Sequence, residues 1–158
     1  MKSEPSDART VEQARAFGLR LLARREYARE ELCQRLLTAQ FPQAIAERVV
    51  EALAAEGLQS DLRFVAALTR RRVGQGYGPY RLRAELRQRG IEDRDDPLGP
   101  EACHEAMVRA HAKRFGSEPP VSPEDWSRRE RFLIRRGFSR SEVITFLKRL
   151  GSPDALHS

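Results

Sequence analysis

The side chains best suited to chemistry in this sequence are its arginines, which stand in short clusters along the chain. Lysine and arginine number 29 against 23 acidic residues, the net charge is +6, and only three of the basic residues are lysines. A guanidinium is a planar fork of N–H donors that matches phosphates and carboxylates. The sequence therefore predicts a binding surface for nucleic acid or an acidic protein. The residues predicted to form it are Arg24, Arg25, Arg70, Arg71, Arg72, Arg128, Arg131, Arg135 and Arg136.

Two interpretations of these clusters remain open. In one, they form a basic stripe along one edge of the molecule, which follows phosphates or meets acidic surfaces. In the other, they are a solvated surface of an arginine-rich chain. Neighbouring residues on a helix point about 100° apart, so only one of each adjacent pair can face a given ligand. The remaining arginines would be solvated or paired with Glu12, Glu30 or Glu130.

The glycines and aspartates of the middle segment do not predict a ligand site. Gly74, Gly76 and Gly78 lack the preceding strand and the following lysine of a phosphate-binding loop, so they are expected to form a turn before Pro79. The acidic segment 92–97 is expected to be a solvated loop, because no second acidic cluster or histidine pair accompanies it.

The pattern of cysteines, histidines and tryptophan likewise predicts no catalytic site and no site for a metal or cofactor. Cys33 and Cys103 lie far apart in helical patterns, which favours a reduced, cytosolic setting over a disulfide. Cys103, His104 and His111 lack the spacing of a zinc site and are expected to be a core thiol and two surface imidazoles. Trp126 is expected to anchor its helix, with stacking on a base as the alternative.

Apolar residues recur at helical spacing through most of the chain, and caps, prolines and glycines separate the helices. Ser122 before Pro123 and Ser139 before Glu142 are predicted helix caps. No apolar run is long enough to cross a bilayer. Helices are predicted from Thr10 to about 24–26, and over 28–40, 42–57, 60–72, 79–90, 100–115, 122–136 and 139–151.

One unit of the sequence recurs: a helix, an arginine pair, a turn with one aromatic residue, and a second helix with a leucine stripe. Residues 22–36 align without a gap on residues 133–147, and residues 27–41 align on residues 77–91. Such a unit cannot bury its own apolar face, so neighbouring units must stack on it. The residues of this structural motif are Tyr27, Leu32, Leu36, Tyr77, Gly78, Pro79, Leu82, Leu86, Gly137 and Phe138.

The expected fold is all-α, an elongated array of about three tandem three-helix repeats. The chain is expected to be a monomer without cofactors. The predicted division is a disordered N-terminal tail over 1–9, repeats over 10–57, 58–98 and 99–151, of which the second has a short third helix, and a C-terminal tail over 152–158.

Four groups of residues follow the order and spacing of a known family over about residues 10–150. They are Leu22-Ala23-Arg24-Arg25-Glu26-Tyr27 with Glu31-Leu32; Asp61 with Arg63-Phe64-Val65; Gly76-Tyr77-Gly78-Pro79 with Leu82, Glu85-Leu86 and Gly90-Ile91; and Phe132-Leu133 with Arg135-Arg136-Gly137-Phe138. With them the sequence resembles the RecX family, regulators of the RecA recombinase. The chain departs from the family pattern at 92–97, where an acidic segment replaces an apolar-striped helix.

The resemblance implies a cytosolic, non-enzymatic protein that binds RecA filaments along the filament groove and damps strand exchange, ATP hydrolysis and co-protease activity. It also implies non-specific contact with DNA and a place in recombination, DNA repair and the SOS response. A general basic helical DNA-binding protein without a recombinase partner is the alternative. Against this alternative, no helix pairs base-reading side chains with a dimerisation segment.

Overall fold

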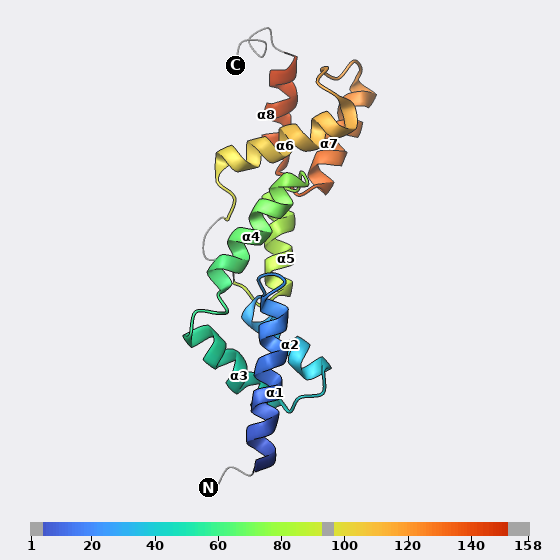
Figure 1. Ribbon diagram of the computed structural model, residues 1–158. Coiled ribbons are helices and arrows are strands. Elements are labelled where there is room, and N and C mark those ends of the chain that lie inside the picture. Colours follow the sequence, from blue (N-terminus) through green and yellow to red (C-terminus); the bar gives the residue numbers. More distant parts are fainter. Residues whose placement is uncertain (1–4, 93–96, 152–158) are drawn as a thin grey trace. The chain divides into compact units, whose positions relative to one another are not determined.

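The computed structural model describes residues 5–92 and 97–151 of the chain. Within these ranges the chain is all-helical and has no strand, as the sequence predicts (Figure 1). Its helices are α1 (Pro5–Leu22), α2 (Arg29–Thr38), α3 (Gln43–Ala55), α4 (Asp61–Gly74), α5 (Pro79–Gln88), α6 (Pro100–Phe115), α7 (Pro123–Arg135) and α8 (Arg140–Leu150).

The predicted caps of the last two helices are confirmed. The Ser122 hydroxyl accepts a hydrogen bond from the backbone N–H of Asp125 at 3.1 Å, and Pro123 occupies the first turn of α7. Ser139 and Glu142 form a reciprocal capping box at the start of α8. These contacts satisfy N–H groups that have no partner inside the helix, which is why local sequence sets these boundaries.

The start of the first helix differs from the prediction. α1 begins at Pro5, so Thr10 lies inside the helix and not at its N-cap, and residues 5–9 of the predicted tail are helical. Proline suits the first turn of a helix because its missing N–H would have no intrahelical partner there. The predicted C-terminal tail at 152–158 and most of the acidic loop, residues 93–96, lie outside the described residues.

The chain divides into two compact units. Unit 1 holds residues 1–67 and 86–92, and unit 2 holds residues 68–85 and 93–158. The division therefore passes through α4 and α5. The repeat boundaries at 10–57, 58–98 and 99–151 stay a prediction, because they are defined by sequence register and the units are defined by packing.

In unit 1, α3 packs against both α1 and α2. Their shared core has a leucine stripe from α2 and small or branched side chains from α3, which together bury the apolar face that each helix carries. Tyr27, the aromatic residue of the turn before α2, is 5 % exposed. The buried core residues are Ala14, Leu21, Tyr27, Leu32, Leu36, Ala46, Val49, Val50 and Leu53.

In unit 2, α7 packs against α6 and α8. Phe138 is 2 % exposed in the turn between α7 and α8 and corresponds to Tyr27 in the repeat register. Cys103 is buried and His104 is exposed, as predicted, but the prediction of a surface imidazole is wrong for His111, which is 2 % exposed. His111 follows the buried Met107 by one turn of α6, and Arg129 of α7 lies against it.

Two glycines hold the turn before α5 against the turn after α7. The N–H of Gly78 donates to the carbonyl oxygen of Arg136 at 2.8 Å, and the N–H of Tyr80 donates to that of Gly137 at 3.0 Å. A Cβ on Gly78 would lie 2.5 Å from the Gly137 oxygen. Gly137 also has a φ of +102°, a conformation that side chains disfavour. The two turns can therefore approach this closely only because neither position 78 nor position 137 carries a side chain.

No helix in the described ranges is long and apolar enough to cross a membrane. The same residues contain no cluster of histidine, cysteine, aspartate and glutamate that could hold a metal ion.

Candidate partner-binding surface

Three guanidinium groups surround the ring of Tyr77 in unit 2, and these four residues are called here the Tyr77 corner. The Cζ atoms of Arg81, Arg136 and Arg72 lie 4.2, 4.6 and 6.0 Å from the ring centroid. A cation above an aromatic face is attracted by the quadrupole of the ring. The ring therefore orients guanidinium groups that come from three different helices.

The helices of unit 2 position these groups through their ends. Arg72 lies in the last turn of α4, Arg81 in the first turn of α5, and Arg136 caps the C-terminus of α7. The two backbone hydrogen bonds between the turns at Gly78 and Gly137 bring the second and third of these ends together.

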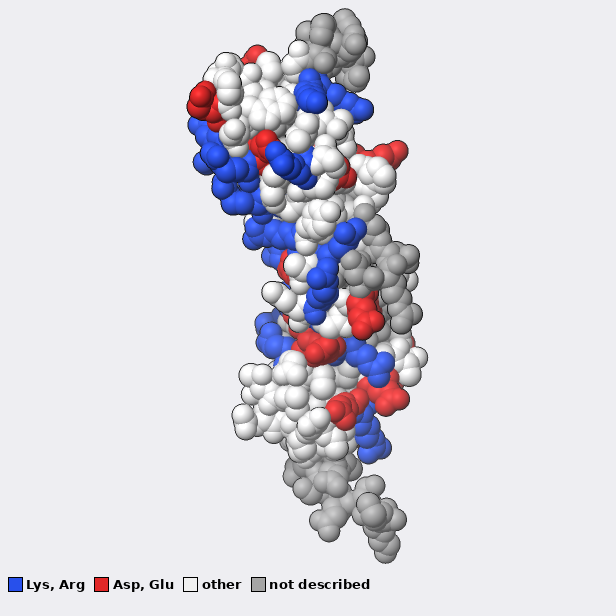
Figure 2. Space-filling model, turned by 180° about the vertical axis from the view of Figure 1, so that it is seen from behind, with Lys and Arg blue, Asp and Glu red and all other residues white. Residues whose placement is uncertain are grey.

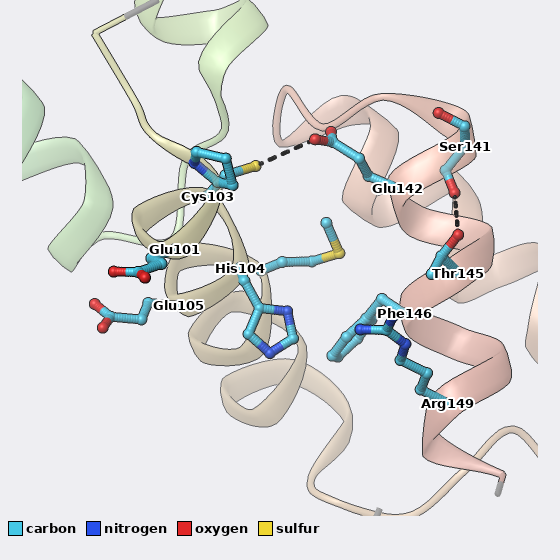
Figure 3. A pocket seen from close by; sticks show the side chains of 11 residues that line it. Glu101, Cys103, His104, Glu105, Ser141, Glu142, Thr145, Phe146 and Arg149 are labelled. Atoms are coloured by element: carbon cyan, nitrogen blue, oxygen red, sulfur yellow. Dashed lines mark hydrogen bonds between the residues drawn. The ribbon is translucent and has the colours of Figure 1, made fainter.

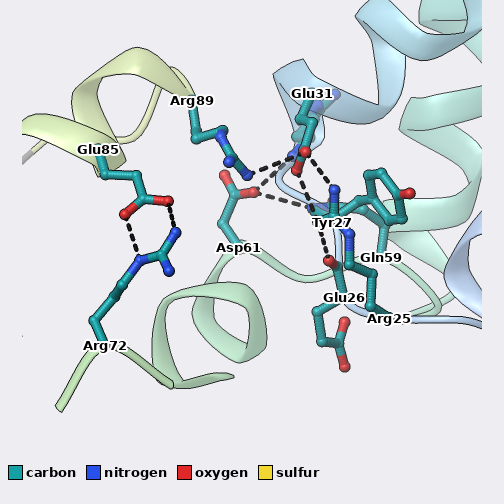
Figure 4. A network of polar contacts seen from close by, with 10 residues as sticks. Arg25, Glu26, Tyr27, Glu31, Gln59, Asp61, Arg72, Glu85 and Arg89 are labelled. Atoms are coloured by element: carbon teal, nitrogen blue, oxygen red, sulfur yellow. Dashed lines mark hydrogen bonds and ion pairs between the residues drawn. The ribbon is translucent and has the colours of Figure 1, made fainter. Parts of the chain in front are cut away.

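The Tyr77 corner has more cations than carboxylates. Arg72 forms a two-point ion pair with Glu85, in which Nε donates to Oε2 at 2.7 Å (Figure 4). Its hydrogen bond to Glu85 raises the pKa of Arg72, so this guanidinium is firmly cationic. Arg81 and Arg136 contact no carboxylate in the part of the chain that the structure describes. Two guanidinium groups thus keep donors for a further anion.

A row of arginines follows one face of α7. Arg128, Arg131 and Arg135 are spaced three and four residues apart, which places them on the same side of the helix, and all three are exposed. Arg128 donates to Asp125 Oδ1 at 2.8 Å. Arg131 and Arg135 form no ion pair with any described residue. In the part of the molecule that α6–α8 form, basic side chains gather along the edge on the side of α7 (Figure 2).

In the equivalent corner of unit 1, a carboxylate pairs with the guanidinium groups. Arg25 stacks on Tyr27, with its Cζ 3.6 Å from the ring centroid, and its NH2 donates to Glu31 Oε1 at 2.7 Å. Arg89 donates to the same carboxylate oxygen at 3.1 Å (Figure 4). The hydrogen bond to Glu31 also raises the pKa of Arg25. In the Tyr27 corner, formed by these four residues, one carboxylate therefore binds both guanidinium groups, a contact that Arg81 and Arg136 lack among the described residues.

A charged network is buried where α7 meets α6. Arg129 donates through NH2 to Asp125 Oδ2 at 2.8 Å and through NH1 to the carbonyl oxygen of Glu118 at 2.6 Å. NH1 also lies 3.1 Å from His111 Nε2, and because a guanidinium has only donors, the neutral imidazole accepts there. The hydrogen bond from Arg129 lowers the pKa of Asp125 to about 2. Burial, together with the charge of Arg129, lowers the pKa of His111.

A groove of about 670 Å³ lies between α6 and α8 (Figure 3). Met107 and Phe146 form its apolar floor, and carboxylates such as Glu101 and Glu142 lie at its sides. The Cys103 thiol donates to Glu142 Oε1 at 3.9 Å, and the thiol is 4 % exposed.

Known sequences match this chain over most of its length. The sequence models "RecX, first three-helix domain" and "RecX, second three-helix domain" match residues 14–53 and 60–95. A regulatory protein RecX of Acidithiobacillus ferrooxidans is 48 % identical over 129 residues, which cover 81 % of this chain and 84 % of the relative. The chain belongs to the RecX family.

Other RecX proteins match over similar lengths. The regulatory protein RecX of Chromohalobacter salexigens is 45 % identical over 131 residues, covering 80 % of this chain and 85 % of the relative. A crystal structure of a regulatory protein RecX matches the fold with a TM-score of 0.75 at 24 % identity, covering 90 % of this chain and 73 % of the other. The RecX structure from Lactobacillus salivarius has a TM-score of 0.65 at 16 % identity, covering 89 % of this chain and 98 % of the other.

The structure of this RecX chain assigns different local roles to the predicted arginines. Arg25 and Arg72 are held in ion pairs, and Arg128 contacts Asp125. Arg136 is held against Tyr77 and Phe132. Among the predicted arginines, those that are exposed and form no ion pair with a described residue are Arg24, Arg70, Arg71, Arg131 and Arg135.

Arg81 and Tyr80 were not among the predicted residues, although both lie in the first turn of α5 and Arg81 contacts the Tyr77 ring. The repeat register contained the signal for Arg81. The position four residues after the aromatic residue is Glu31 in the first repeat and Glu142 in the third, but Arg81 in the middle repeat.

Proposed function

We propose that this RecX-family chain is a non-enzymatic, cytoplasmic modulator of the RecA recombinase, and specifically an inhibitor that binds the RecA–DNA filament. The support comes from two directions. Its relatives, at up to 48 % identity, are named regulatory proteins RecX. Unit 2 carries exposed arginines that lack carboxylate partners among the described residues. This observation carries the proposal, because such a surface attracts a polyanionic filament.

The proposed mechanism is steric and electrostatic. The row of Arg131 and Arg135 on α7, with Arg70 and Arg71 in the C-terminal half of α4, would contact phosphates or carboxylates of the filament. A protein bound there would occupy space that duplex DNA and other filament clients need. Strand exchange, ATP hydrolysis and co-protease activity would then fall together, since all three depend on one filament.

The deciding experiment is a titration of this protein into RecA-driven ATP hydrolysis on single-stranded DNA that RecA has coated beforehand. We expect inhibition well below one copy per RecA protomer, because one bound molecule blocks or caps many protomers. No effect at excess protein would remove the proposed function. If the protein still bound naked DNA, the general helical DNA-binding interpretation would replace it.

A paired variant tests the assigned surface. The double substitution Arg131→Gln with Arg135→Gln should raise the concentration for half-inhibition at least about tenfold, since one charge-assisted hydrogen bond contributes about 1.5 kcal/mol. Both side chains are exposed, so the thermal unfolding midpoint should stay unchanged. Arg35→Gln with Arg48→Gln removes the same charge from exposed positions of unit 1 and is the matched control. Equal inhibition by both variants would refute this choice of surface.

A further inference from the structure

The three repeats differ at one position that decides the charge of each corner. Four residues after the corner aromatic residue, the first and third repeats carry Glu31 and Glu142, and the middle repeat carries Arg81. Both carboxylates form contacts within the protein. Glu31 pairs with Arg25 and Arg89, and Glu142 accepts from the Ser139 hydroxyl at 2.7 Å.

In the middle repeat, the substitution of an arginine for this glutamate reverses the charge. Arg81 and Arg136 lie 4.2 and 4.6 Å from the centroid of the Tyr77 ring, and neither contacts a carboxylate among the described residues. Two guanidinium groups on one ring repel each other, and the ring offsets this repulsion only in part. An anion that both groups contact would offset this repulsion, and the ring already orients both forks.

The surroundings of the Tyr77 corner favour a nucleic-acid strand over a small anion. The Tyr80 ring lies next in the chain to Arg81 and is 56 % exposed, and the Arg83 guanidinium lies 5.6 Å from its centroid. Exposed arginines extend from the corner along the chain on two helices, at Arg71 in α4 and at Arg135 in α7. Arginines interleaved with an exposed aromatic ring are the pattern of surfaces that follow a phosphate backbone and stack a base.

We propose that the Tyr77 corner binds the phosphodiester backbone of single-stranded nucleic acid, with Arg81 and Arg136 on phosphates and Tyr80 stacked on an unpaired base. The Tyr27 corner, whose Arg25 and Arg89 are paired with Glu31, takes no part. This inference rests on the proposed function in one respect only: the RecA–DNA filament is where the protein would meet a single strand. Binding at the corner itself requires no recombinase.

The test is fluorescence anisotropy of a labelled oligothymidylate with the full-length protein alone, measured over a series of NaCl concentrations. Arg81→Gln should weaken binding about fivefold or more at low salt. It should also make the slope of log K against log salt shallower by about 0.7, which corresponds to one lost phosphate contact. Arg35→Gln is the matched control, because Arg35 lies over the ring of Tyr27 with its Cζ 5.9 Å from the centroid. That control should leave both affinity and slope unchanged.

A charge reversal sharpens the test. Arg81→Glu introduces the carboxylate that the other two repeats have at this register, so it should pair with a neighbouring guanidinium as Glu31 does with Arg25. We expect oligothymidylate binding to fall below that of Arg81→Gln while the thermal midpoint is retained. Tyr80→Ala should weaken binding to the single strand and leave binding to a duplex of equal length unchanged.

The outcomes separate this inference from the proposed function. Wild-type affinity for oligothymidylate in Arg81→Glu would overturn the inference. So would an absence of binding by the wild-type protein, even if RecA-driven ATP hydrolysis were inhibited. Conversely, loss of binding in Arg81→Gln and Arg81→Glu supports the corner even if the protein proves to have no effect on RecA.

Discussion

At the scale of single residues, the same arginine side chain plays opposite roles according to what lies within a few ångströms of it. Arg25 and Arg136 occupy the same register position in the first and third repeats. Arg25 is neutralised by Glu31 at 2.7 Å, whereas Arg136 meets a second guanidinium across the Tyr77 ring. Counting arginines cannot separate these cases, because the partner decides whether a charge is available.

The buried His111 predicts a dependence of stability on pH. Its neighbours in unit 2 are the cation of Arg129, the carboxylate of Asp125 and the rings of Phe115 and Phe146. Burial and Arg129 hold its pKa in the folded state below the value of about 6.5 that it has in the unfolded chain. The unfolded state therefore binds more protons below pH 6.5, so the free energy of unfolding should fall as the pH drops through this value. The decrease reaches at most about 1.4 kcal/mol per pH unit for one proton.

Urea unfolding at pH 8, 7, 6 and 5 measures this dependence. His111→Gln should flatten the curve between pH 7 and 5, and His104→Gln, at an exposed position of the same helix, should leave it as it is. Asp125 does not contribute in this window, because its pKa is about 2 in the folded protein. A wild-type curve that is flat down to pH 5 would contradict the assignment of a neutral, buried His111.

At the scale of secondary-structure elements, the ends of the helices matter more than their lengths. Local sequence sets where α7 and α8 begin, through Ser122 and the capping box of Ser139 and Glu142. How the ends of α5 and α7 meet is set by Gly78 and Gly137, which are far apart in sequence. This contact places Arg81 and Arg136 against the ring of Tyr77.

Gly78→Ala should therefore both destabilise the protein and disturb the Tyr77 corner. Its Cβ would lie 2.5 Å from the Gly137 carbonyl oxygen and 2.7 Å from Phe138 Cδ1, so the backbone must shift. We expect a loss of about 2 kcal/mol in the free energy of unfolding, which is typical of overpacking at a close contact. The measurement is equilibrium urea unfolding.

Gly151→Ala is the matched control for this substitution. Its φ is −86°, and among the described residues the nearest neighbour of the new Cβ would be the Lys148 carbonyl oxygen at 3.7 Å, an ordinary contact distance. Its free energy of unfolding should stay within about 0.5 kcal/mol of wild type. A loss as large as that of Gly78→Ala would show that any added methyl group, and not the approach of the two turns, is responsible.

At the scale of the whole molecule, charge is distributed unequally between the compact units. Unit 1 pairs its corner arginines with glutamates, whereas unit 2 combines the Tyr77 corner with the row of Arg131 and Arg135 on α7. The positive charge behind the net charge of +6 is therefore most available in unit 2, where these arginines lack carboxylate partners among the described residues. Such a surface associates with a polyanion by releasing counterions, which makes the association dependent on salt.

Raising NaCl from about 50 to about 200 mM should thus increase the concentration for half-inhibition of RecA-driven ATP hydrolysis at least about tenfold. The hydrolysis by RecA alone, measured at each salt concentration, provides the normalisation. The variant with Arg131→Gln and Arg135→Gln should respond less steeply, because it releases fewer counterions. An identical response in variant and wild type would place the electrostatic contact elsewhere on the chain.

The sequence by itself determined the features that depend on near neighbours along the chain. Helical periodicity, caps and turn glycines act within a few residues, and so the all-helical fold, the starts of α7 and α8 and the repeated aromatic turn could all be predicted. The same reasoning misplaced the start of α1, since several residues near Pro5 suit a first turn equally well.

Only the tertiary structure decided which charges are neutralised and which side chains are buried. Arg89 reaches Glu31 across 58 residues, and Arg136 reaches the backbone of Gln75 across 61. His111 is buried because α7 brings Arg129 against it, 18 residues away. Electrostatic interactions and burial depend on distance in space, and periodicity along the chain carries no measure of that distance. The repeat register shows the charge reversal at Arg81. Only the tertiary structure shows its consequence, which is that Arg81 and Arg136 contact the same Tyr77 ring.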